Sequence, residues 1–328
     1  MRTYLLKRFL LLPVTLFGVT VIVFGMIQLA PGDPAAMVVR GEDPASVEAI
    51  EKWRADRHLD EPVILQYLYW VRDVAMLDFG ESFRPPNEPV LSRLTEALPI
   101  TILLNIISFA LVYGIAIPIG IVCGAKQHTW WDRVLTAIVF MLYALPVFWV
   151  GTMLIIFFAN PRYLHWFPTT GNAGLSWGDP GVTLGHFLAE WTRHIFLPIV
   201  CLTYTGFAYL SRQMRSSVLE QIRQDYVRTA RAKGLSERVV VLRHVVRNSL
   251  IPIVTIFASL LPAMIAGSLI IEVIFSIPGM GRLFFEAVLD RDYPLIMGEV
   301  TIASVLTLVG VLISDICYVF VDPRISYD

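Results

Sequence analysis

The sequence predicts an all-α integral membrane protein with six transmembrane helices. Its 328 residues are 56% hydrophobic and only 16% charged, whereas soluble domains carry about 25% charged residues. Six apolar runs are long enough, or nearly so, to cross a hydrocarbon core of about 30 Å, which takes about 20 helical residues. Each run is continuous rather than alternating, so the spans are expected to be helices rather than strands. The expected spans are 9–30, 98–124, 134–159, 195–210, 250–275 and 300–321.

The first run could be taken for a signal peptide, and the fourth is shorter than a membrane span. The first has an apolar part of about 20 residues and no A-x-A site after it, so we expect a retained helix rather than a cleaved signal peptide. The fourth is short, and we expect His194 and residues 211–214 to extend it.

The distribution of basic residues predicts the topology. Six spans place both termini on one side, together with 125–133 and 211–249. The 63 residues of that side hold 15 Lys and Arg, whereas the 127 residues of the opposite side hold 11. Because basic residues are retained in the cytoplasm, the sequence predicts a multi-pass plasma membrane protein, here a bacterial inner membrane protein, with cytoplasmic N- and C-termini.

The chain divides into three expected parts. Residues 1–97 are the first helix and a long outer segment, 98–321 hold the other five helices, and 322–328 are a cytoplasmic tail. The outer segment opens with the turn signals Pro31-Gly32-Asp33-Pro34, and 47–57 and 63–75 have helical character. A break at Pro278-Gly279 precedes a short amphipathic helix that we expect on the outer face, with Leu283 and Ala287 on its apolar side.

The cytoplasmic segment 211–249 is the most informative stretch. Asp225 is expected to cap a helix of about nine residues, and Gly234 is expected to end it in a left-handed conformation. Ser236 then caps a second helix. Three interpretations remain open on these residues alone: an ordinary positive-inside loop, a surface for anionic lipid, and a docking element for a partner protein.

Few residues within the spans suggest chemistry. Glu272 and Asp315 are the charged residues inside them, and such residues are functional candidates by default. Both also lie near span ends, where helix capping or interhelical hydrogen bonding explains them equally well. Asn105 and Thr203 are further candidates for a pathway or for helix packing. Cys123, Cys201 and Cys317 lie in apolar runs, no spacing suggests a metal site, and His244 has no second ligand nearby.

Several motifs together resemble one family. The segment from Tyr226 to Ser236, continuing through Arg243-His244, Arg247-Asn248 and Ile251-Pro252, is similar to the cytoplasmic EAA loop of type I ABC importer permeases. The resemblance is closest to the dipeptide, oligopeptide and nickel branch, in its first-permease (B-type) form. It covers nearly the whole chain. Further matching stretches are Leu29-Ala30-Pro31-Gly32-Asp33-Pro34, Leu59-Asp60-Glu61-Pro62, Gln66-Tyr67, Phe79-Gly80-Glu81-Ser82, Glu272 to Arg282, Arg291-Asp292-Tyr293-Pro294 and Asp322-Pro323-Arg324.

Two departures from the general EAA pattern narrow the resemblance. Arg228-Thr229-Ala230 stand where the general pattern has Glu-Ala-Ala, and Val246-Arg247 stand where it has Leu-Pro. Both are usual in the peptide branch. They mean that the contact made by the general motif's glutamate does not carry over.

The resemblance implies the type I ABC importer fold and a permease subunit without catalytic residues. A coupling helix would sit in a groove of a cytoplasmic ATPase, and a second permease would complete the pathway for di- or oligopeptides. The implied partners are that permease, two ATP-binding subunits, an extracytoplasmic binding protein and membrane lipid, but no nucleic acid. ATP and Mg would be used by the partners, and this chain would bind no cofactor or metal. The implied coupling residues are Asp225, Tyr226, Arg228, Ala230, Arg231, Ala232, Lys233, Gly234 and Leu235.

Two other classes of membrane protein fit the sequence less well. The chain has no G-x-x-x-x-G-K-[ST] loop, so it does not supply an ATP site by that route. A self-sufficient secondary transporter or channel is the main alternative, but the spans carry almost no charge at mid-depth, where such proteins hold coupling groups. A membrane-embedded enzyme is disfavoured because the spans contain no G-x-S-x-G, no H-E-x-x-H and no paired aspartates. The substrate itself is not readable from the sequence.

Overall fold

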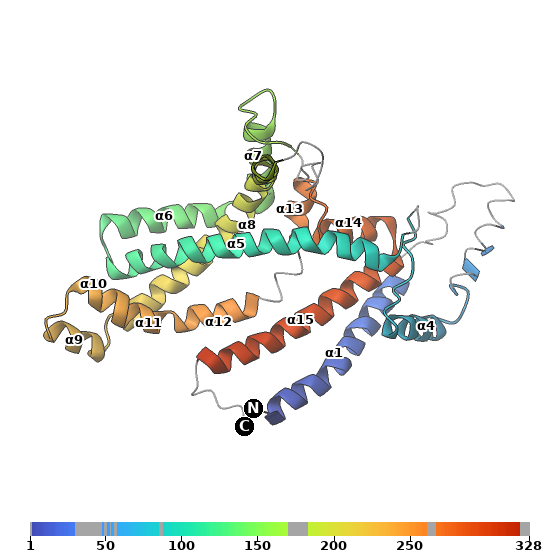
Figure 1. The fold of residues 1–328 in the computed structure, drawn as a ribbon, viewed down its shortest axis with the longest axis horizontal. Coiled ribbons are helices and arrows are strands. Elements are labelled where there is room, and N and C mark those ends of the chain that lie inside the picture. The colour runs from blue at the N-terminus through green and yellow to red at the C-terminus, as the bar shows by residue number, and fades with distance from the viewer. Residues whose placement is uncertain are drawn as a thin grey trace.

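The protein is built from helices (Figure 1). The computed structural model describes residues 2–29, 48, 51–52, 54–55, 58–84, 88–169, 183–260 and 267–321. The predicted all-α class is confirmed, and within these residues the one β-bridge pairs Glu81 with Pro89. The helices are α1 (Arg2–Leu29), α4 (Val63–Ala75), α5 (Val90–Ala125), α6 (Trp130–Ala144), α7 (Val147–Leu154) with the π-helical turn Ile155–Ala159, α8 (Leu184–Gln221), α9 (Asp225–Ala232), α10 (Glu237–Val239) with the π-helical turn Val240–Val245, α11 (Val246–Ser249), α12 (Ile251–Leu260), α13 (Leu269–Ile274), α14 (Met280–Asp290) and α15 (Tyr293–Val321).

Four of these helices are long and apolar enough to cross a membrane, or five if α6 and α7 count as one bent span. They are α1, α5, α8 and α15, and they account for the first, second, fourth and sixth expected spans. The helix α5 begins at Val90, so the expected boundary between residues 97 and 98 falls inside it. The count of six spans stays a prediction.

The third expected span is not one straight helix. The helices α6 and α7 meet at an angle of 93°. Leu145 and Pro146 are extended at the bend, because proline has no N–H to continue the helix and disfavours a helical residue before it. The hydroxyl of Tyr204 on α8 donates a hydrogen bond of 2.9 Å to the Leu145 carbonyl, which replaces a partner lost at the break.

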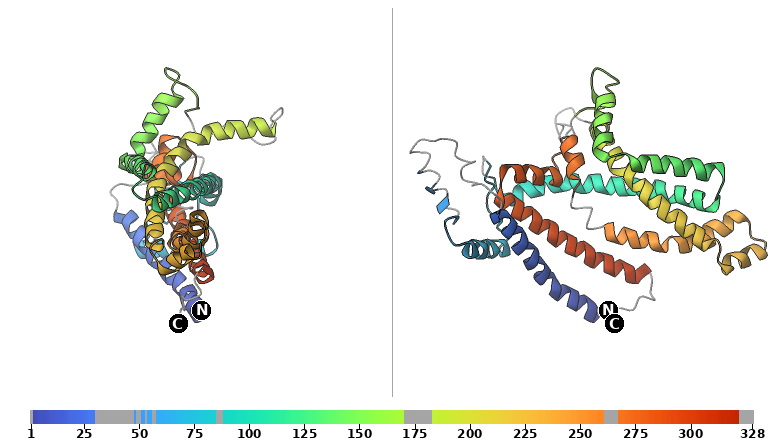
Figure 2. Two further views of the ribbon diagram at one scale, coloured as in Figure 1. Left: turned by 90° about the vertical axis from the view of Figure 1, so that its left-hand side faces the viewer. Right: turned by 180° about the vertical axis from the view of Figure 1, so that it is seen from behind.

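The fourth expected span is much longer than the apolar run. The helix α8 has 38 residues, and Thr183 caps it by accepting a 3.3 Å hydrogen bond from the His186 N–H. The expected outer residues 184–194 and cytoplasmic residues 211–221 are therefore helical. The first part of α8 turns sharply into the rest (Figure 2), and the helix contains Pro198, a usual cause of such a kink.

The fifth expected span is divided as well. The helices α12 and α13 lie on either side of residues 261–266, which fall outside the described part of the chain. Gly267 follows with a φ of +69°, and Ser268 is the N-cap of α13, although its side chain makes no capping hydrogen bond. The chain then turns at 275–279 into α14, which confirms a short helix after Pro278-Gly279, and Leu283 and Ala287 of its expected apolar side are buried.

The helices α5 and α8 form the centre of the fold and pack against each other (Figures 1 and 2). Three glycines allow this approach. A Cβ atom on Gly120 would lie 2.5 Å from the Met214 Cβ, and one on Gly124 would lie 2.6 Å from a Val218 methyl group. Gly206 of α8 fits against Val112 of α5 in the same way. The side chains of one helix therefore pack against the backbone of the other along the C-terminal halves of α5 and α8.

A buried polar cluster holds the N-terminal ends of α5 and α15. The Asp292 carboxylate, 1% exposed, accepts hydrogen bonds from the Ser82 hydroxyl, the Phe83 N–H and the Leu295 N–H. Arg93 of α5 donates to the Ser82 oxygen at 2.9 Å. The cluster joins the segment after α4 to α5 and to the start of α15, which brings two of the sequence motifs together.

The helix α4 confirms the predicted helix at 63–75 and packs on α1. The Tyr67 hydroxyl lies 2.9 Å from the Thr20 hydroxyl, and the Tyr67 ring contacts Phe17 and Phe24 edge to face. Of the other expected helix, at 47–57, residues 48, 51–52 and 54–55 are described, and all of them are helical.

Candidate functional site

The helix α9 lies at one end of the molecule, at the opposite end of α5 from α14 and α4 (Figure 1). Its Val227 is fully buried and Ala230 is 6% exposed. Both belong to an apolar cluster with Leu210 and Met214 of α8 and with Val240. One face of α9 is therefore fixed to the central helix pair.

The opposite face of α9 is open. Of the predicted coupling residues, Ala230 alone is buried. The others are exposed, namely Asp225, Tyr226, Arg228, Arg231, Ala232, Lys233, Gly234 and Leu235. The exposed surface thus presents basic groups and one aromatic ring, while the buried face packs on α8.

The ends of α9 agree with the prediction in part. Gly234 has a φ of +77°, and its N–H donates to the Arg231 carbonyl at 2.9 Å, so the expected left-handed end is confirmed. The expected cap was wrong by one residue: Gln224 is the N-cap, and Asp225 is the first helical residue. The Asp225 carboxylate pairs with Arg228 at 3.3 Å instead. Ser236 precedes α10 as predicted, but its side chain makes no capping hydrogen bond.

An ion pair joins α9 to α10 across the turn at Gly234. Arg231 donates two hydrogen bonds to the Glu237 carboxylate, at 2.7 and 3.1 Å. The hydrogen bonds from Arg231 hold the pKa of Glu237 below its usual value. The contribution of this pair is therefore present above the unfolded pKa of Glu237 and is lost as pH falls through the lowered folded value.

A second ion pair supports the same end of the molecule, and the sequence reading missed it. Arg215 of α8 donates to both oxygens of Asp132 at 2.9 and 3.1 Å, and Asp132 is 4% exposed. Asp132 also accepts hydrogen bonds from the His128 N–H and the Thr136 hydroxyl. The pair fixes the turn between α5 and α6 to α8. Its two residues are 83 positions apart, and no local pattern signals that distance.

The pathway candidates occupy separate places. Asn105 lines a cavity of about 150 Å³ between α5 and α8, together with Ser108 and Thr205. Thr203 is buried, and its hydroxyl donates to the carbonyls of Ile199 and Val200 within its own helix. Asp315 lies on α15, but its side chain is outside the described part. A role for these residues in a pathway stays a prediction.

Glu272 has a clear structural setting. Its carboxylate is 2% exposed and accepts hydrogen bonds from the Thr101 hydroxyl at 3.3 Å, the Ser268 N–H at 3.2 Å and the Arg282 N–H at 3.0 Å. The last of these caps the N-terminus of α14. Glu299 of α15 is also buried, and one of its oxygens has no hydrogen-bond partner among the described residues. Sequence reasoning did not single out Thr101 or Glu299.

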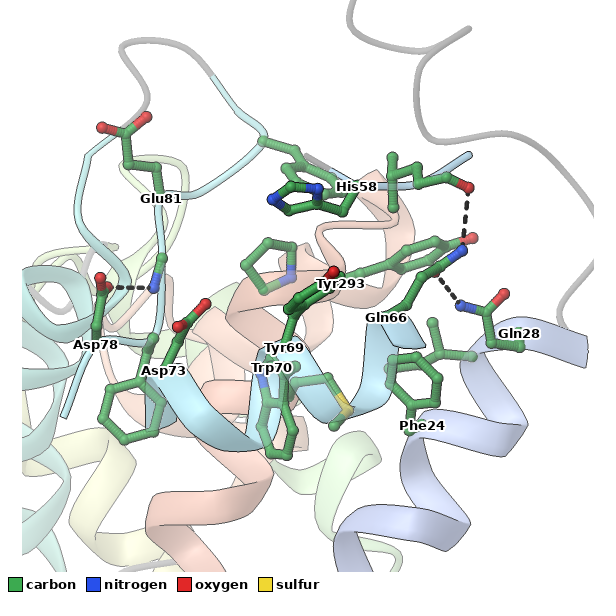
Figure 3. Close-up of a pocket in the computed structure, with 17 residues that line it drawn as sticks. Phe24, Gln28, His58, Gln66, Tyr69, Trp70, Asp73, Asp78, Glu81 and Tyr293 are labelled. Atoms are coloured by element: carbon green, nitrogen blue, oxygen red, sulfur yellow. Dashed lines mark hydrogen bonds between the residues drawn. The ribbon is translucent and has the colours of Figure 1, made fainter. Parts of the chain in front are cut away.

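A pocket of about 360 Å³ lies between α1, α4 and the start of α15 (Figure 3). Aromatic rings line it, with Tyr69 and Trp70 labelled on α4 and Tyr293 opposite. The carboxylates of Asp73, Asp78 and Glu81 line it too, and its described lining includes neither Lys nor Arg, although Arg72 pairs with Asp73 at 2.8 Å. The indole N–H of Trp70 is buried and has no acceptor in the described part of the chain. The pocket thus combines aromatic surface with negative charge.

Comparison with known proteins gives matches over the whole chain. Residues 116–327 match the family described as binding-protein-dependent transport system inner membrane component, and residues 1–105 match the N-terminal domain that accompanies it. An oligopeptide transport system permease protein, AppB of Bacillus subtilis, is 37% identical over 328 residues, which is all of both chains.

Two further relatives agree with this result. A dipeptide transport system permease protein, DppB of Alkalihalophilus pseudofirmus, is 36% identical over 342 aligned residues, covering 100% of both chains. The DppB protein of Bacillus subtilis is 31% identical over 99% of this chain and 98% of its own length. The expected family is therefore confirmed: the chain belongs to the binding-protein-dependent transport system inner membrane components, the permease subunits of ABC importers.

Proposed function

We propose that this permease forms, with a second homologous permease, the translocation pathway of an ATP-driven importer for di- or oligopeptides. An extracytoplasmic binding protein delivers the peptide, and two separate ATP-binding subunits supply the energy. The names of the relatives, which are oligopeptide and dipeptide transport permeases, support peptides as the substrate class.

One observation carries the coupling part of this proposal: α9 has one buried face and one open face. Val227 and Ala230 anchor it to α8, while Ala232 and Lys233 are exposed, and Arg228 and Arg231 lie on the side of the helix that borders the turn 126–129. A groove on an ATP-binding subunit can hold the open face without disturbing the anchor. Closure of the two ATP-binding subunits then moves α9, and α8 and the chain leading into α12 move with it. This is alternating access carried by rigid elements.

The same arrangement supports the proposed topology. The ends of α5 and α8 beside α9 face the cytoplasm, and α4 and α14 lie on the outer side of the plasma membrane. The N-terminus of α1 and the C-terminus of α15 are then cytoplasmic, in line with the higher density of basic residues there. Six spans follow if α6 with α7, and α12 with α13, each cross once.

We place the contact with the binding protein on the outer face formed by α4 and α14. The pocket of Figure 3 offers a concrete recognition element there. Its carboxylates and aromatic rings suit a Lys or Arg side chain of the binding protein, since aromatic faces and carboxylates both attract a cation.

Site-directed cross-linking tests the coupling role. In a background without the three native cysteines, Ala232→Cys is expected to capture an ATP-binding subunit in the assembled transporter. Ala230→Cys is the matched control, because the two positions lie on the same helix but Ala230 is 6% exposed and faces the anchor. Capture from position 230 but not from 232, or capture from neither, contradicts the proposal.

A further inference from the structure

A basic hollow lies beside α9 on the side of the central helices. It has a volume of about 670 Å³, and its walls are the ends of α5 and α8, the turn 126–129 and one side of α9. Four of its lining residues are cationic, namely Lys126, Arg223, Arg228 and Arg231, and none is acidic. Lys126 comes from the turn after α5 and the other three from the stretch 223–231, so the fold brings two separate segments together around the hollow.

The charges in the hollow are only partly compensated. Arg228 and Arg231 pair with Asp225 and Glu237, whose side chains are 94% and 61% exposed and lie outside the hollow. Lys126 and Arg223 make no ion pair within the described residues. An anion that enters the hollow therefore meets at least two cations without a fixed counter-charge.

The position of the hollow along the membrane normal follows from the residues next to it. Trp130 and Trp131 begin α6 directly after the turn that lines the hollow, and they are 71% and 58% exposed. Exposed tryptophans at the end of a membrane helix mark the level of the lipid headgroups. The apolar run of α5 ends at Gly124, which itself lines the hollow. The hollow thus lies where the phosphates of the inner leaflet are found.

We propose that the hollow binds the phosphate headgroup of an anionic phospholipid, of which phosphatidylglycerol is the simplest probe. Basic pockets between membrane helices on the cytoplasmic side suit such headgroups. The bound lipid bridges the turn 126–129 to Arg228 and Arg231, and so fastens α9 to the α5–α8 pair. The proposal that lipid binds depends only on the hollow. The effect of the bound lipid on transport rests on the proposed coupling function.

Lipid retention by the assembled transporter tests the site. The transporter is reconstituted in phosphatidylcholine nanodiscs with increasing phosphatidylglycerol, then released and weighed by native mass spectrometry. The double variant Lys126→Gln/Arg223→Gln is expected to need about 30-fold more phosphatidylglycerol for equal retention, since each basic residue near an anionic surface contributes about fivefold. The matched control is Arg238→Gln/Arg243→Gln, which removes two exposed charges of the same segment that do not line the hollow. Its retention should equal that of the unaltered protein.

Three results would overturn the inference. One is equal retention in the two double variants. Another is displacement of the lipid by millimolar inorganic phosphate, which would make a free anion the ligand. The last is a hollow variant that retains lipid but loses its ATP-binding subunits, which would assign the hollow to that partner.

The Ala232→Cys cross-link separates this inference from the proposed function. If the hollow variant loses lipid but keeps the cross-link, and its uptake no longer responds to phosphatidylglycerol, both proposals hold. If the unaltered protein retains lipid but never gives the cross-link, the coupling proposal fails and the lipid site stands.

Discussion

Replacement of Gly234 isolates the backbone geometry at the end of α9. Its φ of +77° is a conformation that L-residues avoid, yet a Cβ atom there would meet nothing within 4 Å. The penalty for Gly234→Ala is therefore purely conformational, about 1–2 kcal/mol. At 25 °C this lowers the population of the native helix end about 5- to 30-fold relative to a frayed one. Gly234→Pro costs about 3 kcal/mol or more, because its φ is fixed near −65° and the N–H bonded to Arg231 is lost.

The expected order of uncoupling is Asn, then Ala, then Pro at position 234, since Asn tolerates the left-handed conformation best. The assay compares peptide uptake with ATP hydrolysis in proteoliposomes of the assembled transporter. Uptake per ATP should fall along the series while membrane insertion, followed by size-exclusion chromatography, stays constant. Gly185→Ala is the matched control, because that glycine also has open space around it but no positive φ. Normal coupling in Gly234→Pro, or equal effects of the two alanine variants, would refute the argument.

Substitutions at three other sites test contacts that stabilise the fold, and each is measured as a thermal midpoint of unfolding in detergent. Gly120→Ala should lower stability by about 1–3 kcal/mol by overpacking against Met214; an unchanged midpoint would mean that α5 and α8 are not in close contact. Glu272→Ala should cost about 2–4 kcal/mol by leaving buried donors unsatisfied, and Glu272→Gln should cost less; equal losses would exclude the capping role. Arg215→Ala should cost about 2–4 kcal/mol, since the buried Asp132 loses its partner, and adding Asp132→Asn should recover part of the loss.

Much of the fold could be predicted because hydrophobic length is a local property. The apolar runs located α1, α5 and α15, and helical spacing located α4 within the outer segment. Residues 184–194 were assigned to an outer loop because they include His, Glu and Arg, although a helix does not require apolar residues to continue. The 93° bend was not predicted, because a proline in a span signals a break but not its angle.

The candidate site shows the same division. Gly234 and the helix before it could be predicted because neighbouring residues determine where a helix begins and ends. The pairing of Asp132 with Arg215, and of Thr101 with Glu272 171 positions away, depends on how helices pack. Tertiary packing determines those partners, and a single sequence does not show which helices pack together. The buried face of α9 was likewise invisible, since Ala230 and Ala232 look alike in sequence and only Ala230 is buried.

The glycine contacts between α5 and α8 restrict how this protein changes shape. Gly120, Gly124 and Gly206 each receive a particular side chain of the other helix, so a sliding motion along the axis would drive a methyl group into backbone atoms. The pair must travel as a single block. Among the described residues, we therefore expect any bending between the helices to occur at the non-helical joints 145–146, 267–268 and 275–279, and not between α5 and α8.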